Sequence, residues 1–312
     1  MTTAEPYRPE LREEWNALAR AARVPHFMFE REYVEYHADR FADASLVVRD
    51  RGRPVALLPA SRSGDVVTSH GGLTFGGLLA DERLTAGRTL AALDAVLAAL
   101  REAGARRLVY RAPPHVYHRA PAEEDLYALT RAGARLVRRD LSAAVFGPEP
   151  VGPHPSRRRN VRAARAAGLT VREEGAIEDL MAVVRANLAE RHGVAPTHDD
   201  AEMRLLADRF PDSIRPFAVR DEAGGIVAGT IVYETPVCAH AQYIAATGEG
   251  RRGYALDLLF DHLVGERFAA KRWFDFGIST TDEGRALNAG LVRYKENFGA
   301  RGVVHDHYAL DL

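Results

Sequence analysis

The chain has 312 residues, of which 46% are apolar and 27% are charged, a composition typical of a folded protein long enough for two ordinary domains. Its net charge of −1 excludes binding of nucleic acid or membranes through bulk charge, so any such surface must be a local patch. The single cysteine excludes an internal disulfide framework, and the polar start and the lack of a run near the roughly 20 apolar residues of a membrane span favour a cytoplasmic protein with no membrane span.

The first half of the chain predicts helices around a set of short strands. Leu11, Trp15 and Leu18 recur at helical spacing, and residues 84–103 form a long amphipathic pattern that ends at Gly104. The other elements that we expect in this half are a helix at 31–40, strands at 45–49, 54–60 and 65–69, a glycine-dense loop at 71–77, a strand at 107–111, a helix at 123–132 and one or two strands at 136–146.

A segment rich in Pro and Gly, residues 147–155, predicts a linker between two domains, 1–150 and 151–312. After it, a similar order of elements returns. We expect helices at 156–167, 177–192 and 200–210, strands at 215–220, 226–234 and 237–245, a Gly/Arg turn at 248–253 before an amphipathic helix, a strand at 272–276, a helix at 286–296 and a strand at 303–310. This order predicts the α/β class, with mixed sheets between helices in two tandem domains.

The last forty residues hold the most informative pattern. Lys295 is one of two lysines among 42 basic residues, which favours a role that suits a compact ammonium group better than a guanidinium, although coincidence is an alternative. Asp275 ends the predicted strand and either faces a cleft or caps the next loop. Asn288 and Tyr294 lie between Asp275 and Lys295 in the sequence. They either orient a substrate amide or have structural roles, Asn288 as a helix cap and Tyr294 in helix packing.

The Gly/Arg turn predicts an anion site at the start of a helix. Arg251 and Arg252 supply charge, and Gly253 lets the backbone approach the phosphates of a donor substrate. The alternative is a tight turn with solvated arginines.

A basic helix face follows the linker. Arg158, Arg162 and Arg165 share one side of the helix, which favours contact with the phosphates of a nucleotide-linked substrate or of RNA. A merely solvated basic face is equally compatible with the pattern.

Histidines at the ends of elements include His240, which is a candidate general base because imidazole titrates near neutral pH. A hydrogen-bonded structural histidine is the alternative. The sequence contains no spacing typical of a metal site, no Gly-x-Ser-x-Gly elbow and no Walker-type loop, so we expect no metal.

Taken together, these segments resemble the FemAB-like, FemX-type branch of the GNAT acyltransferase superfamily over most of the chain. The segments that carry the resemblance are Phe75–Asp81, Arg158-x-Asn160-Val161, Gln242-Tyr243-Ile244-Ala245, Phe274-Asp275-Phe276-Gly277 and Tyr294-Lys295-x-x-Phe298-Gly299. The resemblance implies substrate-binding roles for Asp81, Arg158, Asn160, Arg191 and Tyr243. Phe75 and Leu78 replace an Arg and a Pro of the family pattern.

The resemblance implies two GNAT-like domains and transfer of an activated acyl or aminoacyl group to a small-molecule amine, forming an amide. The donor is a substrate rather than a permanently bound cofactor, and is either aminoacyl-tRNA or acyl-CoA. Because the turn from Gly250 to Ala255 is one residue shorter than the usual acyl-CoA signature, we favour aminoacyl-tRNA, with contact to the tRNA acceptor end, in secondary-metabolite or cell-surface glycan biosynthesis.

The chemistry that this reaction requires assigns roles to a small set of residues. We expect Lys295 to stabilise the developing negative charge, and Asp275, Asp81, His240 or a group of the substrate itself to remove the proton of the amine. Two alternatives remain: an acyl-CoA-dependent N-acetyltransferase, and a non-catalytic protein that binds a nucleotide-linked ligand on a degenerate GNAT frame.

Overall fold

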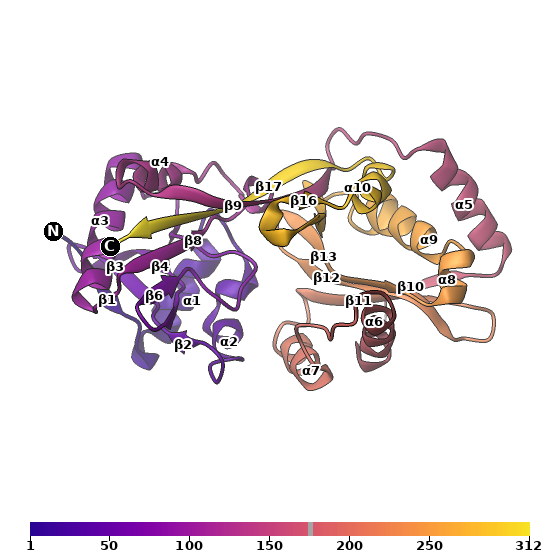
Figure 1. The fold of residues 1–312 in the computed structure, drawn as a ribbon, viewed down its shortest axis with the longest axis horizontal. Helices are drawn as coiled ribbons and strands as arrows, with labels where there is room; N and C mark the ends of the chain where they lie inside the picture. The colour runs from indigo at the N-terminus through magenta and orange to yellow at the C-terminus, as the bar shows by residue number, and fades with distance from the viewer. Residues whose placement is uncertain (174–176) are drawn as a thin grey trace. The chain divides into compact units, whose positions relative to one another are not determined.

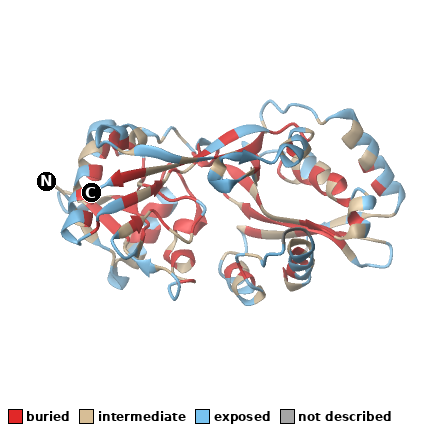
Figure 2. Cartoon of the chain, viewed as in Figure 1, coloured by how far each residue is buried: buried red, intermediate tan, exposed pale blue. Residues whose placement is uncertain are grey.

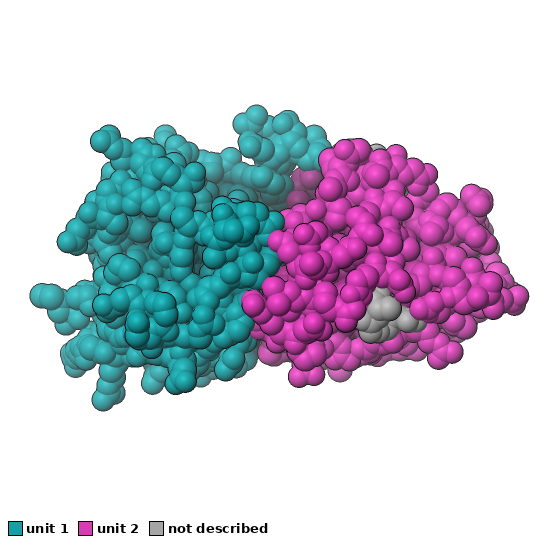
Figure 3. Space-filling view, turned by 90° about the horizontal axis from the view of Figure 1, so that it is seen from below, with its two compact units in different colours: residues 1–141, 281–286, 304–312 teal, residues 142–280, 287–303 magenta. Residues whose placement is uncertain are grey.

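The structure, a computed structural model, describes residues 1–173 and 177–312, and the side chains of residues 191 and 192 lie outside the described part. The chain forms two compact units (Figure 3). Unit 1 comprises Met1–Leu141, Thr281–Ala286 and Val304–Leu312, and unit 2 comprises Ser142–Thr280 and Leu287–Val303. The units are not contiguous halves, because the chain returns to unit 1 near its end. The division into domains 1–150 and 151–312 stays a prediction.

Two strands, β9 (Arg135–Phe146) and β17 (Arg301–Asp311), contribute residues to both units. After β14 (Trp273–Ile278), the chain forms β15 (Thr280–Thr281), a 3-10 turn η5 (Asp282–Gly284) and β16 (Ala286–Leu287). Strand β15 pairs with β16 in a separate two-stranded sheet.

Unit 1 combines two small groups of strands with helices (Figure 1). Its elements are β1 (Thr2–Pro6), η1 (Pro9–Leu11), α1 (Arg12–Ala21), η2 (Phe27–Phe29), α2 (Arg31–Val34), β2 (Ala42–Asp43), β3 (Leu46–Asp50), β4 (Arg53–Leu58), β5 (Ser61–Ser63), β6 (Val66–Thr68), β7 (Leu79–Ala80), α3 (Ala86–Glu102), β8 (Arg107–Arg111), η3 (His115–Tyr117) and α4 (Glu124–Arg131). One sheet has the order β1-β3-β4-β7, and β17, β8, β6, β5 and β2 follow one another in the other.

The core of unit 1 is built on the apolar face of α3. Leu93, Val96, Leu97 and Leu100 recur at helical spacing and are buried against strand residues such as Val48. This is the helix that the amphipathic pattern predicts, with Gly104 at positive φ just after its end. Figure 2 shows the buried residues inside the unit.

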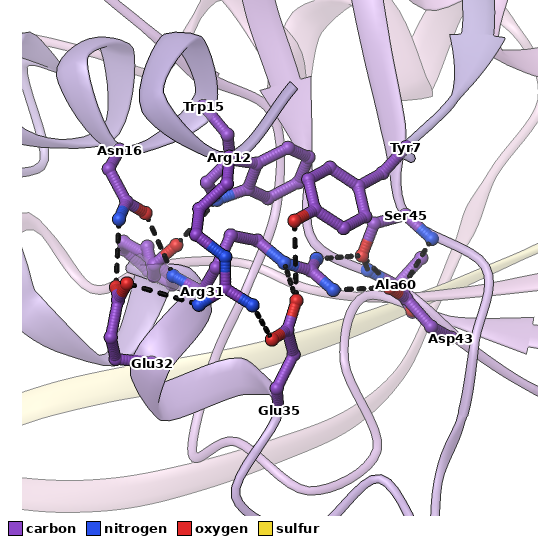
Figure 4. A network of polar contacts seen from close by, with 11 residues as sticks. Tyr7, Arg12, Trp15, Asn16, Arg31, Glu32, Glu35, Asp43, Ser45 and Ala60 are labelled. Carbon is purple, nitrogen blue, oxygen red and sulfur yellow. Dashed lines mark hydrogen bonds and ion pairs between the residues drawn. The ribbon is translucent and has the colours of Figure 1, made fainter. Parts of the chain in front are cut away.

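A buried arginine joins the N-terminal segments of unit 1 (Figure 4). The guanidinium of Arg31 lies 3.6 Å from the centre of the Tyr7 ring and donates to Glu35 at 3.0 Å and to Ser45 at 3.2 Å. It also forms an ion pair with Asp43. Because Arg31 is only 1% exposed, its charge is compensated by carboxylates rather than by solvent.

Unit 2 has a mixed sheet of order β10-β11-β12-β13-β14-β9, in which β13 and β14 run parallel and the other neighbours run antiparallel. Its elements besides β9 and β17 are α5 (Pro155–Ala166), β10 (Thr170–Glu173), α6 (Ile177–His192), α7 (Asp200–Arg209), β11 (Ile214–Arg220), β12 (Ile226–Glu234), β13 (Cys238–Ala246), α8 (Gly248–Arg252), α9 (Ala255–His262), a π-helical turn η4 (Leu263–Arg267), β14 (Trp273–Ile278) and α10 (Ala289–Glu296).

Helices cover both faces of the unit 2 sheet (Figure 1). On one face, α5 and α9 close a core that includes Val161, Leu259 and Phe274. On the other face α6 packs on β12, where Leu180 comes so close that a Cβ at Gly229 would lie 2.3 Å from its Cδ1. Gly229 therefore serves close helix-to-sheet packing.

Several boundaries differ from the sequence expectations. The polar start of the chain forms β1, because it pairs with β3 along its whole length. The helix expected at 31–40 ends at Val34, and the helix expected from 286 begins at Ala289, after β16. The segment 136–146 forms one long strand.

Within residues 1–173 and 177–312, no helix combines the length and the apolar character that crossing a bilayer requires. In the same described residues, no group of three or more His, Cys, Asp and Glu side chains is placed to hold a metal ion.

Candidate functional site

Asp275 lies on β14, between β13 and β9 of the unit 2 sheet. The register places it opposite Ala144 on β9 and beside His240 on β13. Its fully buried carboxylate accepts hydrogen bonds from Ser142 Oγ at 2.6 Å and from Gly277 N at 3.0 Å, and His240 Nδ1 lies 2.9 Å from its second oxygen. This contact suits the tautomer that carries its proton on Nδ1.

The sequence expectation that Asp275 ends its strand is wrong. Strand β14 continues to Ile278, so Asp275 is an interior residue of the strand. Ladder pairing with β9 is interrupted between Asp275 and Ile278, although the strand itself continues. Its carboxylate accepts from Gly277 N at this irregularity, so the expected local capping contact is present.

Gly277 makes this irregularity possible. Its φ of +78° is in the left-handed region that side chains disfavour, and a Cβ there would lie 3.4 Å from His240 Cε1. The turn brings the carbonyl oxygens of Gly277 and Ile278 towards α10, because both oxygens accept from Lys295.

Lys295 is buried, with 2% of its surface exposed. Its Nζ donates to Gly277 O at 2.7 Å, to Ile278 O at 2.8 Å and to Ser279 Oγ at 2.8 Å. Burial lowers the pKa of Lys295 to about 8, and the Asp275 charge opposes this shift. All three donors of the ammonium thus meet neutral acceptors, which explains why a buried charge is tolerated, whereas the loss of hydration on burial lowers the pKa.

Three of the expected catalytic residues therefore lie in one cluster. His240 contacts Asp275, Asp275 binds Gly277, and the carbonyl of Gly277 accepts from Lys295. The cluster also contains Ser142 and Ser279, which sequence reasoning missed. Ser279 follows the Phe-Gly strand motif directly, but only the turn geometry shows that its hydroxyl meets the lysine.

Asn288 and Tyr294 take the structural roles that were their alternatives. Asn288 caps α10, because its Oδ1 accepts from Leu291 N at 3.0 Å. The Tyr294 ring lies 5.1 Å from that of Phe298, with the Arg157 guanidinium 4.6 Å from the Tyr294 centroid. The hydroxyl of Tyr294 has no hydrogen-bond partner in the described part of the chain, and burial raises its pKa.

Asn160 belongs to a polar contact between α5 and α9. Its Nδ2 donates to Asp257 Oδ1 at 3.0 Å, and Arg157 pairs with the same oxygen at 2.6 Å. Arg158 is exposed on α5, as are Arg159, Arg162 and Arg165. Arg165 pairs with Asp261 at 3.3 Å.

The Gly/Arg turn forms the short helix α8. Arg251 donates to Ala246 O at 2.8 Å and pairs with Glu190, whereas Arg252 is exposed. A Cβ at Gly250 would lie 2.0 Å from Val227 O, so that glycine is required by packing. A Cβ at Gly253 would lie no closer than 3.4 Å to any described atom around it. Packing within the described residues therefore does not require glycine at this position.

Tyr243 and Asp81 make side-chain contacts with residues outside this cluster. Tyr243 on β13 accepts from His198 N at 3.2 Å and lies 2.7 Å from His198 Nδ1. Asp81 belongs to unit 1, where it accepts from Arg83 N and pairs with the Arg83 guanidinium. Burial alone would raise the pKa of Asp81, but the hydrogen bonds from Arg83 outweigh it and lower the pKa. Arg191 lies in α6, and its side chain is outside the described residues.

Residues 155–296, which include the whole Asp275–Lys295 cluster except Ser142, match the family of acetyltransferase (GNAT) domains. Among solved structures, FemX is similar with a TM-score of 0.70 and 11% identity, over 99% of this chain and 97% of that one. L-PGS from Bacillus licheniformis has a TM-score of 0.59 and 14% identity, over 82% and 81% of the two chains. A search of curated proteins finds no match.

A tandem GNAT protein from the clavulanic acid biosynthesis pathway is similar over 100% of this chain and 98% of that one, with a TM-score of 0.50 and 14% identity. At these identities the likeness concerns the fold, and it confirms the expected tandem GNAT architecture.

Proposed function

We propose that this chain, whose residues 155–296 match acetyltransferase (GNAT) domains and whose fold is similar to that of FemX, is an acyltransferase that transfers an aminoacyl group from aminoacyl-tRNA to a small-molecule amine. The product is an amide, in secondary-metabolite or cell-surface glycan biosynthesis in the cytoplasm. The observation that carries the proposal is the cluster within the matched segment in which the buried Lys295 and Asp275 lie beside the partly buried His240.

Aminolysis of an ester places negative charge on the carbonyl oxygen and on the leaving oxygen. A preorganised cation in a site with little water stabilises such charge strongly. Lys295 fits this role because its ammonium is fixed by two carbonyls and a hydroxyl, so its position is set before the substrates bind.

The attacking amine must also lose a proton. His240 suits this role because Asp275 engages Nδ1, so that any proton uptake takes place at Nε2. The buried carboxylate of Asp275 then stabilises the imidazolium that forms. Asp275 thus acts through His240 and orients it.

The basic surface of α5 supports tRNA as the donor. Arg158, Arg159 and Arg162 are exposed on one helix, although the whole chain has a net charge of −1. A local basic patch of this kind fits contacts to the phosphates of an acceptor stem, and such contacts weaken steeply as salt rises.

Acyl-CoA is the second candidate donor, because the matched family is one of acetyltransferase domains. Arg252 and Gly253 then contact the donor phosphates, with Arg251 nearby. Arg251 would have to exchange its pairing with Glu190 to take part. This requirement makes the acyl-CoA alternative the weaker of the two.

The test compares the two donors directly. The purified protein is incubated with a mixed pool of aminoacyl-tRNA or with acetyl-CoA, each with amino sugars and lysine peptides as amine acceptors, and amides are detected by mass spectrometry. We expect an aminoacyl amide that disappears when RNase is added first. The double variant Arg158→Ala/Arg159→Ala should raise the KM for tRNA.

An acetylated product that forms without tRNA and resists RNase would contradict aminoacyl transfer and favour the acetyltransferase. The same double variant also serves as a control with acetyl-CoA. If the α5 arginines bind tRNA, their substitution should change the KM for acetyl-CoA by less than about twofold, which is much less than the change in the KM for tRNA.

A further inference from the structure

Ser279 holds a distinct position in the cluster, as the residue after β14. It is buried, with 2% of its surface exposed, and its backbone oxygen accepts from Asn288 N at 2.9 Å. Its Oγ accepts from Lys295 Nζ at 2.8 Å. Among the described residues the hydroxyl has no other partner, so when Lys295 is an ammonium the O–H of Ser279 has no acceptor there.

The three partners of Lys295 differ in what they can do with a proton. The carbonyl oxygens of Gly277 and Ile278 only accept hydrogen bonds. The hydroxyl of Ser279 both accepts and donates. A proton that leaves Nζ and moves on to another group can therefore pass through Ser279, whereas the two carbonyls only hold the amine in place.

The electrostatics of the cluster allow Lys295 to give up a proton. Burial lowers its pKa to about 8, and Asp275 is the charged group that acts on it in the opposite direction. Asp275 in turn binds Ser142 and His240. An acid whose pKa lies near the working pH is the most effective general acid.

The turn that carries the hydroxyl reaches the protein surface. Ile278, the residue before Ser279, is 40% exposed, although Ser279 and Lys295 are buried. A substrate can therefore contact this turn at Ile278, the residue next to the one that carries the hydroxyl.

We propose that Ser279 relays a proton from Lys295 to the oxygen atom that the donor ester releases; this rests on the proposed aminoacyl transfer. The amine forms a C–N bond with the acyl carbon, and the C–O bond of the ester breaks. The leaving oxygen takes the proton of Ser279 Oγ, which takes one from Lys295 Nζ. The amine gives its proton to His240, and exchange with solvent restores both residues, so one proton moves overall from the amine to the leaving hydroxyl.

The relay makes Ser279 a determinant of the donor class. An ester releases an alkoxide, which is strongly basic and must be protonated as it leaves. A thioester releases a thiolate, whose conjugate acid has a pKa of about 8.5, so it leaves without a proton donor. The relay therefore favours an oxygen ester such as aminoacyl-tRNA over acyl-CoA.

The test uses two donors with the same aminoacyl group: the aminoacyl-tRNA, and the aminoacyl thioester of N-acetylcysteamine. Both are offered with the same mixture of amino sugars and lysine peptides. We expect Ser279→Ala to lower kcat about 100-fold with the ester and less than about threefold with the thioester, since general acid catalysis contributes about 10²–10⁴-fold. Ser279→Thr, which keeps a hydroxyl, should recover part of the activity with the ester.

The matched control is Ser142→Ala. This variant removes a buried hydroxyl from the same cluster, but one that binds Asp275 and not Lys295. We expect equal losses with both donors. Melting temperatures of all variants check the fold, and Ser279→Gly, which also lacks a hydroxyl, replaces Ser279→Ala if the alanine variant does not fold.

Equal losses of Ser279→Ala with the ester and the thioester would overturn the relay and leave aminoacyl transfer standing. If the wild-type protein consumes neither donor, the proposed function itself fails, and the relay fails with it.

Discussion

Each unit buries a cation, but the two units neutralise that charge in different ways. In unit 1, Arg31 is 1% exposed and pairs with the carboxylates of Glu35 and Asp43. In unit 2, Lys295 is 2% exposed and meets two backbone carbonyls and one hydroxyl. A guanidinium between carboxylates keeps its charge, whereas an ammonium among neutral acceptors loses its proton more readily.

This difference separates a structural cation from a reactive one. The Arg31 network joins α2 to the strands around it through two carboxylates and a hydroxyl (Figure 4). The Lys295 cluster lies within the segment that matches a GNAT domain, and the pKa of its lysine is about 8. Substitution of Lys295 should therefore mainly lower turnover, whereas substitution of Arg31 should mainly lower stability.

The largest expected effect is on turnover. Lys295→Met should lower kcat about 10²–10³-fold with little change in KM, because it removes a charge that acts mainly in the transition state. Steady-state kinetics in the transfer assay measure this. Lys271→Met is the control: Lys271 pairs with Glu234 at 2.8 Å, outside the cluster, and its loss should leave kcat within about twofold. Near-normal kcat in Lys295→Met would remove the lysine from the mechanism.

The next effect is on stability. Arg31→Met should lower the free energy of unfolding by about 2–4 kcal/mol, because Glu35 and Asp43 keep their charges without the buried partner. Urea unfolding measures this loss, and kcat should stay unchanged below the melting temperature. Arg12→Met is the control, since Arg12 is 41% exposed and its pairs should contribute less than about 1 kcal/mol. Equal losses in the two variants would refute the special role of Arg31.

A smaller effect should follow from Asp275→Asn. The amide no longer stabilises an imidazolium at His240, so kcat should fall about 10–100-fold. The charge of Asp275 raises the pKa of Lys295, so its loss should lower that pKa below 8. The pH dependence of kcat and the titration of Lys295 measure both changes. A variant in which neither quantity moves would separate Asp275 from the site.

The smallest effect is a pH dependence of stability. The folded pKa of Lys295 is about 8 and its unfolded pKa is near 10.4, so between these values the unfolded state binds the additional proton. Stability from this group therefore rises with pH across that window, by about 1.4 kcal/mol per unit. The unfolding free energy of the wild type minus that of Lys295→Met should therefore rise from pH 8 to pH 10. A constant difference would contradict the lowered pKa.

The sequence predicted the cluster's charged members but not its neutral ones. Lys295 and Asp275 were visible from motif and composition, and the register of β13 on β14 placed His240 beside Asp275. Ser142 and Ser279 were not found, because their roles depend on the pairing of β9 and on the turn at Gly277. Local sequence carries no signal for such contacts.

The fold was predicted better than its boundaries. Long periodic segments such as α3 were recovered, whereas β1 was missed because its residues are polar and its strand exists only through pairing with β3. The Gly/Arg turn was interpreted as a phosphate site at Arg251, Arg252 and Gly253, which stays a prediction, and its Gly250 is required by the close approach to Val227 O. A glycine that serves packing and one that serves a ligand look alike in a sequence.

The central claim is that Lys295 has a pKa near neutrality because it is buried among neutral acceptors. The chain has two lysines, so protein labelled with ¹³C and ¹⁵N in lysine gives two side-chain signals, and Lys295→Met assigns them. The account predicts that the Lys295 signal shifts with a midpoint near pH 8. A Lys295 signal that keeps the shift of a charged ammonium up to pH 10 would contradict it.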